Sequence, residues 1–327
     1  MQKSIFVILL AIGLLTACTK DEGFTPEPDQ NFRQEMRNFV VGLSKYAKQS
    51  KPEFLIIPQN GIELVSQTEE PTGPPAEDYL AAIDGNGQED LFFGYDQDDK
   101  ATDPAETNKL IKYLSISKQA GNSILVSDYC STAKNISNSY SWNQQNGFIS
   151  FAATERELNI IPKVAVHNEN KLNIKKLSEA KNFLYLINPN GFASKQAFIQ
   201  AVTATNYDVL IMDLYFTDGQ KFNSQEISAL RKKANGGSRL LISYMSIGEA
   251  EDYRPYWDGS WQKNRPSWVV AENPDWKGNF KVKYWDKEWQ NIIYGNDKSY
   301  LKNIMDAGFD GAYLDIIDAF QYFEDLQ

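Results

Sequence analysis

Five apolar runs of the chain end in side chains that can accept, donate or transfer protons. Their last polar residues are Asn60, Asp128, Asp213, Glu249 and Asp315. Carboxyl groups serve as acids, bases and nucleophiles, and amides bind ligands by hydrogen bonds. Runs that are apolar almost throughout are typical of strands buried on both faces of a parallel sheet, whose carboxyl ends form the working face of an α/β barrel. The alternative is that strands often stop at Asp or Asn because these residues favour turns.

The elements that would position these side chains alternate between helices and buried strands. Helices are expected at 107–120, 224–234 and 300–307, each followed closely by glycine. Eight strands of a (β/α)8 TIM barrel are predicted near residues 54–58, 81–84, 124–128, 183–187, 208–214, 239–245, 281–285 and 310–315. Apolar runs at 148–153 and 268–271 fall outside this count. A doubly wound open sheet is the alternative, but no GxGxxG motif follows a strand as a dinucleotide fold requires.

Residues 32–327 are expected to form one domain, since a TIM barrel usually takes about 250 residues or more. Its first element is a helix from Phe32 to Gln49. The apolar side chains of this helix lie at helical spacing on one stripe: Phe32, Met36, Phe39, Val40, Leu43 and Ala47.

Residues 1–18 read as a signal peptide, with Lys3 before an apolar stretch that is too short to span a membrane comfortably. Leu15-Thr-Ala-Cys18 resembles a bacterial lipobox, which implies that Cys18 is lipidated; an ordinary secretory peptide is the alternative. Residues 19–31 are polar and contain two prolines, which predicts a tether. The Lys-Asp-Glu at 20–22 resembles a surface-export signal. We therefore expect an extracytoplasmic outer-membrane lipoprotein displayed at the cell surface, with only its lipid in the membrane.

Composition excludes several kinds of site. With Cys18 lipidated, Cys130 is the other cysteine of the chain, so no internal disulfide is expected. The single histidine, His167, is expected in a solvated loop, so neither a metal nor another cofactor is predicted. A net charge of −10 without a basic cluster argues against nucleic acid and suits neutral or cationic substrates. Aromatic residues make up 13% of the chain and serve sugar stacking or core packing.

Four blocks in the second half resemble glycoside hydrolase family 114, the endo-α-1,4-polygalactosaminidase group, and especially its bacterial extracellular branch. The blocks are Tyr207–Asp213, Ser243–Arg254, Val282–Asp286 and Gly308–Asp318, and Ser-Ile-Gly-Glu-Ala-Glu at 246–251 is the most specific part.

Three further blocks, at 54–64, 84–92 and 125–129, resemble segments that follow the Tyr-Leu-Asp strand in typical members, whereas here they come first. We therefore expect a circularly permuted barrel in which the stretch before Asn60 lies parallel to the stretch before Asp315. A closed barrel permits this because it has no privileged first strand. The alternative, an unrelated first domain followed by a truncated barrel, would expose two sheet edges.

Glycoside hydrolysis requires two carboxyl groups beside one glycosidic bond. The resemblance implies Asp315 as nucleophile or base and Glu89 as acid. Asp315 could instead cap the next helix. Glu89 follows Asp84-Gly-Asn-Gly87, which is expected to form a flexible turn that brings the side chain to a ligand or leaves it on the surface.

The other candidate residues are expected to bind substrate. Asp213, Asn60, Asp128 and Tyr244 would hydrogen-bond sugar hydroxyls or an amine, although Asn60 precedes Gly61 and could form a turn. Glu249 and Glu251 could contact substrate, or one could pair with Arg254. Further candidates, each with a structural alternative in the core or at a helix cap, are Trp285, Asp286 and Asp318.

The sequence thus predicts an endo-acting glycosidase for an α-linked polysaccharide, with the amino sugar α-1,4-galactosamine implied by the resemblance alone. The competing hypothesis is a glycan-binding surface lipoprotein that has the same fold and no turnover. A scaffold for a larger assembly is a third hypothesis, which predicts an exposed apolar patch on the helices.

Overall fold

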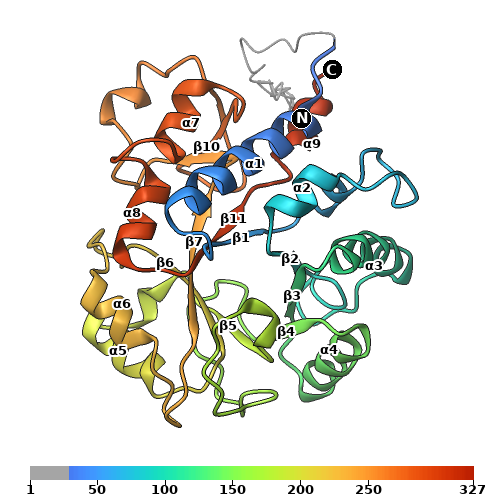
Figure 1. The fold of residues 1–327 in the computed structure, drawn as a ribbon, viewed down its shortest axis with the longest axis vertical. Helices are drawn as coiled ribbons and strands as arrows, with labels where there is room; N and C mark the ends of the chain where they lie inside the picture. Colours follow the sequence, from blue (N-terminus) through green and yellow to red (C-terminus); the bar gives the residue numbers. More distant parts are fainter. Residues whose placement is uncertain (1–28) are drawn as a thin grey trace, which may run out of the picture.

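The computed structural model describes residues 29–327 (Figure 1). The predicted signal peptide, Cys18 and most of the predicted tether lie outside these residues. None of the described helices is long and apolar enough to cross a membrane.

Parallel strands form two sheets. The first has five strands in the order β1 (Leu55–Pro58), β11 (Gly311–Asp315), β7 (Leu240–Ser246), β6 (Val209–Asp213) and β5 (Phe183–Tyr185). The second has the order β2 (Gly85–Glu89), β3 (Ser123–Tyr129) and β4 (Ile149–Ala153). The strand interiors are buried on both faces, as near-continuous apolar runs require.

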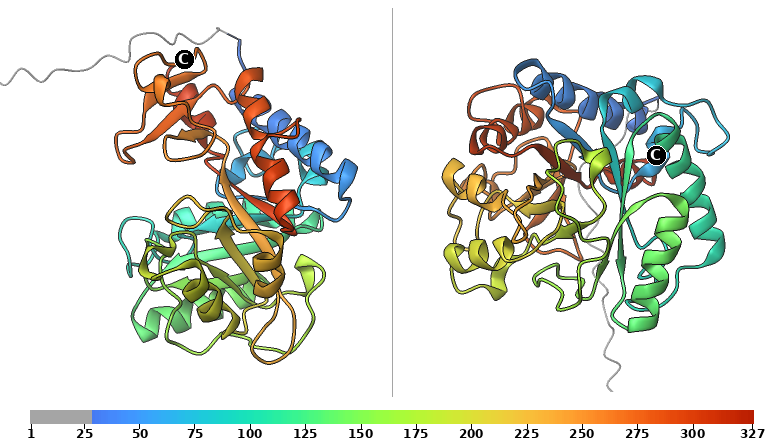
Figure 2. Two further views of the ribbon diagram at one scale, coloured as in Figure 1. Left: turned by 90° about the vertical axis from the view of Figure 1, so that its left-hand side faces the viewer. Right: turned by 60° about the horizontal axis from the view of Figure 1, so that its bottom comes forward.

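The two sheets meet at both edges. After β1, Gln59 forms a parallel bridge with Gly87 of β2, and the Asn60 N–H donates to the Gly87 carbonyl at 2.9 Å. At the other edges β4 lies beside β5, where Phe151 and Phe183 pack with ring centroids 5.7 Å apart. The helices lie around the outside of the strands (Figures 1 and 2). The predicted α/β class with parallel sheets is therefore confirmed.

The predicted pairing of the two distant ends of the chain is also present. Strand β1 runs parallel to β11, with Leu55 opposite Gly311 and Pro58 opposite Leu314. The stretch before Asn60 thus lies beside the stretch before Asp315. Both strands point their carboxyl ends toward the same edge of the sheet.

The predicted strand at 81–84 is wrong, because these residues form the end of helix α2 (Glu77–Ala82) and the turn that follows it. The strand is instead the glycine-containing run of β2, which was expected to be a flexible turn. A Cβ atom on Gly87 would lie 1.9 Å from the Tyr313 hydroxyl oxygen of β11. Glycine is needed there because the tyrosine occupies the space of a side chain.

The predicted strand at 281–285 also differs. Residues Asn279–Val282 form β10, the middle strand of a small antiparallel sheet between β8 (Glu249–Glu251) and β9 (Val269–Glu272). Buried Phe280 and Val282 alternate with partly exposed neighbours, which is typical of antiparallel strands with one wet face. The unassigned run at 148–153 supplies β4 instead. The unassigned run at 268–271 contributes to β9.

Helices connect and cover the strands. Besides α2 they are α1 (Phe32–Ser50), α3 (Pro104–Gln119), α4 (Ala133–Asn146), α5 (Lys195–Thr203), α6 (Ser224–Leu230), α7 (Lys287–Ile293), α8 (Tyr300–Ala307) and α9 (Ala319–Glu324). Short 3-10 turns span Ile62–Val65, Leu177–Glu179, Pro189–Gly191 and Gly259–Gln262. The predicted apolar stripe of α1 is buried in full. Helix α8 ends at Gly308 with φ +98°, as predicted, whereas α6 ends four residues before its expected limit of 234.

The first and last described elements pack together. Arg33 of α1 pairs with Glu324 of α9 at 2.9 Å, and the Phe32 and Phe323 rings lie 5.4 Å apart. The Gln327 side chain donates to the Gln30 carbonyl at 3.1 Å. The two ends of the folded region are therefore adjacent.

Candidate active site

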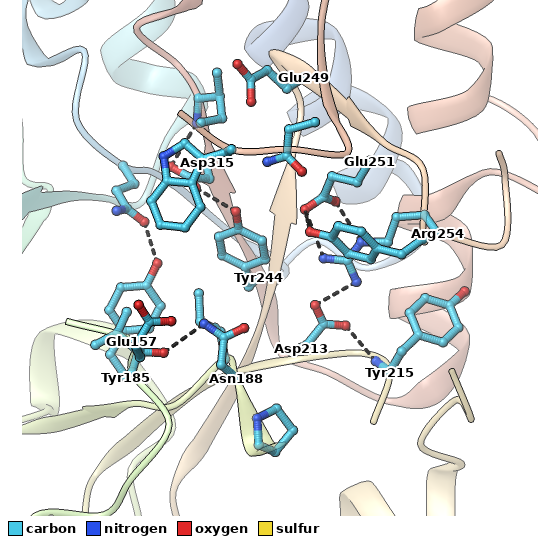
Figure 3. A pocket seen from close by; sticks show the side chains of 18 of the residues that line it. Glu157, Tyr185, Asn188, Asp213, Tyr215, Tyr244, Glu249, Glu251, Arg254 and Asp315 are labelled. Carbon is cyan, nitrogen blue, oxygen red and sulfur yellow. Dashed lines mark hydrogen bonds and ion pairs between the residues drawn. The ribbon is translucent and has the colours of Figure 1, made fainter. Parts of the chain in front are cut away.

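A pocket of about 480 Å³ lies at the carboxyl ends of the parallel strands. It is lined by residues at or just beyond the ends of β1, β2, β5, β6, β7 and β11, together with the small antiparallel sheet. Figure 3 shows many of the side chains that line it, and the residues that it labels run from Glu157 to Asp315 along the chain. The structure brings most of the predicted residues to this pocket: Asn60, Glu89, Asp213, Tyr244, Glu249, Glu251, Asp315 and Asp318.

Asp315 is the last residue of β11. Its Oδ2 accepts a hydrogen bond from the Tyr244 hydroxyl at 2.6 Å, and its Oδ1 accepts one from the Ile316 N–H at 2.8 Å. Ile316 has φ +59°, which is a costly conformation for a β-branched residue and is typical of functional sites. Burial raises the pKa of Asp315 to about 7, and the negative charge of Glu89 adds to the rise.

Glu89 is the last residue of β2 and is held by two neighbours. The Asn60 side-chain amide donates to Oε2 at 3.0 Å, and the Asn60 Oδ1 accepts the Glu89 backbone N–H at 3.0 Å. The Tyr129 hydroxyl donates to Oε1. Asn60 has φ +58°, so it also makes the turn that was its alternative role. The carboxyl group of Glu89 is therefore fixed in the pocket.

Tyr185 stands beside both carboxyl groups. Its hydroxyl donates to Gln59 Oε1 at 2.7 Å (Figure 3). Burial raises the pKa of Tyr185, and the charges of Glu89 and Asp315 raise it further. Both charges thus act on the same hydroxyl, although 226 positions separate Glu89 and Asp315 in the sequence.

A buried ion-pair network forms one wall of the pocket (Figure 3). Arg254 pairs through Nη1 with Asp213 Oδ2 at 2.7 Å and through Nε with Glu251 Oε2 at 2.6 Å. The Tyr215 N–H donates to Asp213 Oδ1 at 2.7 Å. Of the two glutamates expected either to contact substrate or to pair with Arg254, Glu251 is the one that pairs. The network locks the β8 segment to the end of β6.

Glu249 and Asp318 complete the acidic lining. Glu249 accepts the Asn273 side-chain amide at 2.8 Å and lies 3.5 Å from Lys281 Nζ. Asp318 occupies the position before α9 but makes no side-chain capping bond. Burial raises the pKa of Asp318 to about 6, with further contributions from Glu63, Glu89 and Glu249. Carboxylates therefore outnumber cations in the pocket.

Three predicted substrate-binding residues do not line this pocket. Asp128 is fully buried and accepts hydrogen bonds from the Phe92 N–H at 2.8 Å and the Ser139 hydroxyl at 2.6 Å. Trp285 packs in an aromatic cluster against Phe32 and Phe323. Asp286 caps α7 by accepting the Glu288 N–H at 2.8 Å. Asp128 and Asp286 thus accept backbone N–H groups, and Trp285 packs against other rings.

The single histidine also lies away from this pocket. His167 stacks on Tyr140 with ring centroids 4.1 Å apart and is partly buried, not solvated as expected. Cys130 is a buried free thiol. Within residues 29–327, no group of three or more His, Cys, Asp or Glu side chains is placed to hold a metal ion.

Several lining residues had no clear signal in the sequence. Gln59 and Tyr129 each adjoin a predicted strand-end residue, so their positions could have suggested them. Tyr185 is the last residue of β5, within the longer strand predicted at 183–187, and Arg156 lies in a loop. The guanidinium of Arg156 lies 3.9 Å from the Tyr129 ring centroid and pairs with Asp90 at 2.9 Å. Only the folded arrangement reveals these contacts.

Comparison with known proteins gives a consistent result for the second half of the chain. Residues 176–327 match the family model described as Glycoside-hydrolase family GH114. An uncharacterized protein of Methanocaldococcus jannaschii is 41% identical over 157 residues, which is 47% of this chain and 41% of that protein.

Two further uncharacterized relatives are similar. One from Deinococcus radiodurans is 40% identical over 126 residues, covering 38% of each chain. One from Thermotoga maritima is 38% identical over 121 residues, covering 37% of this chain and 36% of the relative. The chain thus spans about two fifths of the length of the curated relatives it matches.

Proposed function

Because this chain belongs to glycoside-hydrolase family GH114 through residues 176–327, we propose that it hydrolyses glycosidic bonds with the carboxyl groups of Asp315 and Glu89. The single observation that carries the proposal is their placement. Both line one pocket at the strand ends, and the negative charge of Glu89 raises the pKa of Asp315. Two interacting carboxyl groups beside an open pocket are what glycoside hydrolysis requires.

Each group has a role in the proposed reaction. The carboxyl pair carries one proton, which Glu89 gives to the glycosidic oxygen as the bond from that oxygen to the anomeric carbon breaks. Asp315 either attacks the anomeric carbon or takes a proton from the water that attacks it. The hydroxyls of Tyr129 and Tyr244, which contact Glu89 and Asp315, can rotate to donate or accept as the protonation states change.

The fold in which this happens is proposed to be a closed, circularly permuted barrel. The strand order runs β5, β6, β7, β11, β1, β2, β3, β4, and β4 lies beside β5. The family match begins just before β5, so β5 would be the first strand of the usual order. Residues 32–153 would then supply the elements that follow α9 in other members. The adjacency of Gln30 and Gln327 supports this arrangement.

The proposed substrate is an α-linked polysaccharide that contains amino sugars, such as α-1,4-galactosamine, cleaved within the chain. The acidic lining of the pocket supports a substrate with free ammonium groups, because carboxylates attract cations. Cys18 would anchor the protein to the outer membrane by its lipid. The glycan would then be met outside the cytoplasm.

The test is to assay reducing-end release from de-N-acetylated and acetylated α-1,4-galactosamine polymers by residues 29–327. Asp315→Asn and Glu89→Gln should each lower the rate at least about a hundredfold, since general acid–base catalysis alone contributes about that much. Asp286→Asn is the matched control, because this carboxylate caps α7 outside the pocket.

Other outcomes of the same assay distinguish hydrolysis from the competing hypothesis of glycan binding without turnover. A protein that binds these polymers without releasing reducing ends would be the glycan-binding lipoprotein. Full activity in either pocket variant would reject the pair. The loop at 68–76, which could have plugged the groove, does not line the pocket, and this favours turnover over binding alone.

A further inference from the structure

The rim of the pocket carries an exposed indole. Trp276 lines the pocket, yet 61% of its surface is accessible. Exposing a large aromatic side chain forgoes the favourable burial of its apolar area. Such a ring at the edge of a pocket is well placed to cover the apolar face of a ligand.

The turn that carries Trp276 is held rigidly between β9 and β10. The Asn279 N–H donates to the Trp276 carbonyl at 3.0 Å, and Gly278 supplies the φ of +90° that the turn needs. The Gly278 N–H donates to Glu272 Oε1 at 3.0 Å, and its carbonyl accepts the Asp252 N–H at 2.9 Å. Little backbone freedom would therefore be lost on binding a ligand.

Glu249 presents an unsatisfied oxygen in the same pocket. The residue is only 2% exposed, and its Oε1 accepts from Asn273, which lies just before the Trp276 turn. Its Oε2 is buried and has no hydrogen-bond partner among residues 29–327. A buried carboxylate oxygen without a donor is costly, so it favours a ligand that brings one.

We propose that Trp276 and Glu249 form a second sugar-binding subsite beside the carboxyl pair. The inference rests on the proposed hydrolysis and adds where a further unit of the polysaccharide is held. The indole covers the apolar face of a pyranose ring. Glu249 Oε2 accepts a hydrogen bond from a hydroxyl or an ammonium group of that sugar. The carboxyl pair and this subsite would hold two sugar units of the same polysaccharide, as cleavage within a polymer requires.

The test measures binding by calorimetry in an Asp315→Asn background, which keeps the ligand uncleaved. The ligands are α-1,4-linked galactosamine oligosaccharides of two to six units, in acetylated and de-N-acetylated forms. Trp276→Ala should weaken binding of the longest oligosaccharides about tenfold, as loss of an aromatic contact predicts, and change binding of the shortest little. Tyr95→Ala is the control, because Tyr95 is 57% exposed but lies outside the pocket.

Glu249→Gln should weaken the same complexes, with thermal melting as the check that it folds. A loss confined to de-N-acetylated ligands identifies an ammonium donor, and an equal loss with both forms identifies a hydroxyl donor. The subsite is rejected if Trp276→Ala binds every length as the Tyr95→Ala control does. If the wild-type protein releases no reducing ends and the Asp315→Asn protein binds no oligosaccharide, the proposed function and the subsite are both wrong.

Discussion

At the scale of single residues, the site depends on how two carboxyl groups from distant parts of the sequence are held. Asp315 is fixed by Tyr244 and the Ile316 N–H, and Glu89 by Asn60 and Tyr129. Each residue that hydrogen-bonds these carboxyl groups was either not predicted from the sequence or predicted to bind substrate. Asn60 shows why: a polar residue after a strand looks the same whether it binds a ligand or orients a catalytic group.

The pKa of Asp315 makes a prediction about pH. The proposed reaction needs one proton on the carboxyl pair. Asp315 loses its proton near pH 7 beside the negative charge of Glu89, so kcat/KM should fall as the pH passes upward through about 7. Asp318→Asn removes a negative neighbour that raises this pKa, so the midpoint of the fall should move to lower pH. Initial rates between pH 5 and 9 measure both. An activity that instead keeps rising through pH 7 would show that the reaction needs no proton on this pair.

At the scale of elements, the predictable strands were the apolar runs that became β1, β3, β5, β6, β7 and β11. Strand β2 was missed because its glycines favour a turn locally, and only the folded structure shows that Tyr313 occupies the space of a side chain at Gly87. Strand β10 was placed in the wrong sheet, although alternation of buried and exposed residues from Asn279 to Val282 was present in the sequence. A contact with another element decided the case of β2, whereas β10 carried a local pattern typical of an antiparallel strand.

Gly87→Ala tests the packing of β2 on β11. The added Cβ would meet Tyr313 at 1.9 Å, so we expect a loss of about 1–3 kcal/mol in the free energy of unfolding. Urea unfolding measures it. Gly259→Ala is the matched control, since a Cβ there meets no described atom within 4 Å and its backbone needs no positive φ. Equal stability of the two variants would mean that Gly87 is not packed as described.

At the scale of the whole molecule, the two ends of the folded region lie together and the parallel strands follow one another from β5 around to β4. The sequence could predict that the front and back of the chain are neighbours, because its blocks resemble a family in a different order. Single blocks could not show which side chains meet across the pocket. Trp276 and Arg156, which come from loops, had to be found in the structure.

A rearranged chain tests the proposed permutation. Gln327 would be joined to Gln30 by a short Gly-Ser linker, and new ends would be opened between Lys163 and Val164 in the exposed segment before β5. We expect a protein that melts within a few degrees of the original and keeps reducing-end release, since circular permutation at adjacent ends is usually tolerated. An insoluble or unfolded product would argue against one continuous folding unit in the family order.

The central claim is that Asp315 and Glu89 act on the same glycosidic bond in different roles. The most direct measurement compares the rates of Glu89→Gln and Asp315→Asn on the polymer and on a 2,4-dinitrophenyl α-galactosaminide, whose leaving group needs no protonation. We expect Glu89→Gln to fail on the polymer but to retain most of the wild-type rate on the aryl glycoside, whereas Asp315→Asn should be inactive on both. Equal impairment of Glu89→Gln on the two substrates would contradict it.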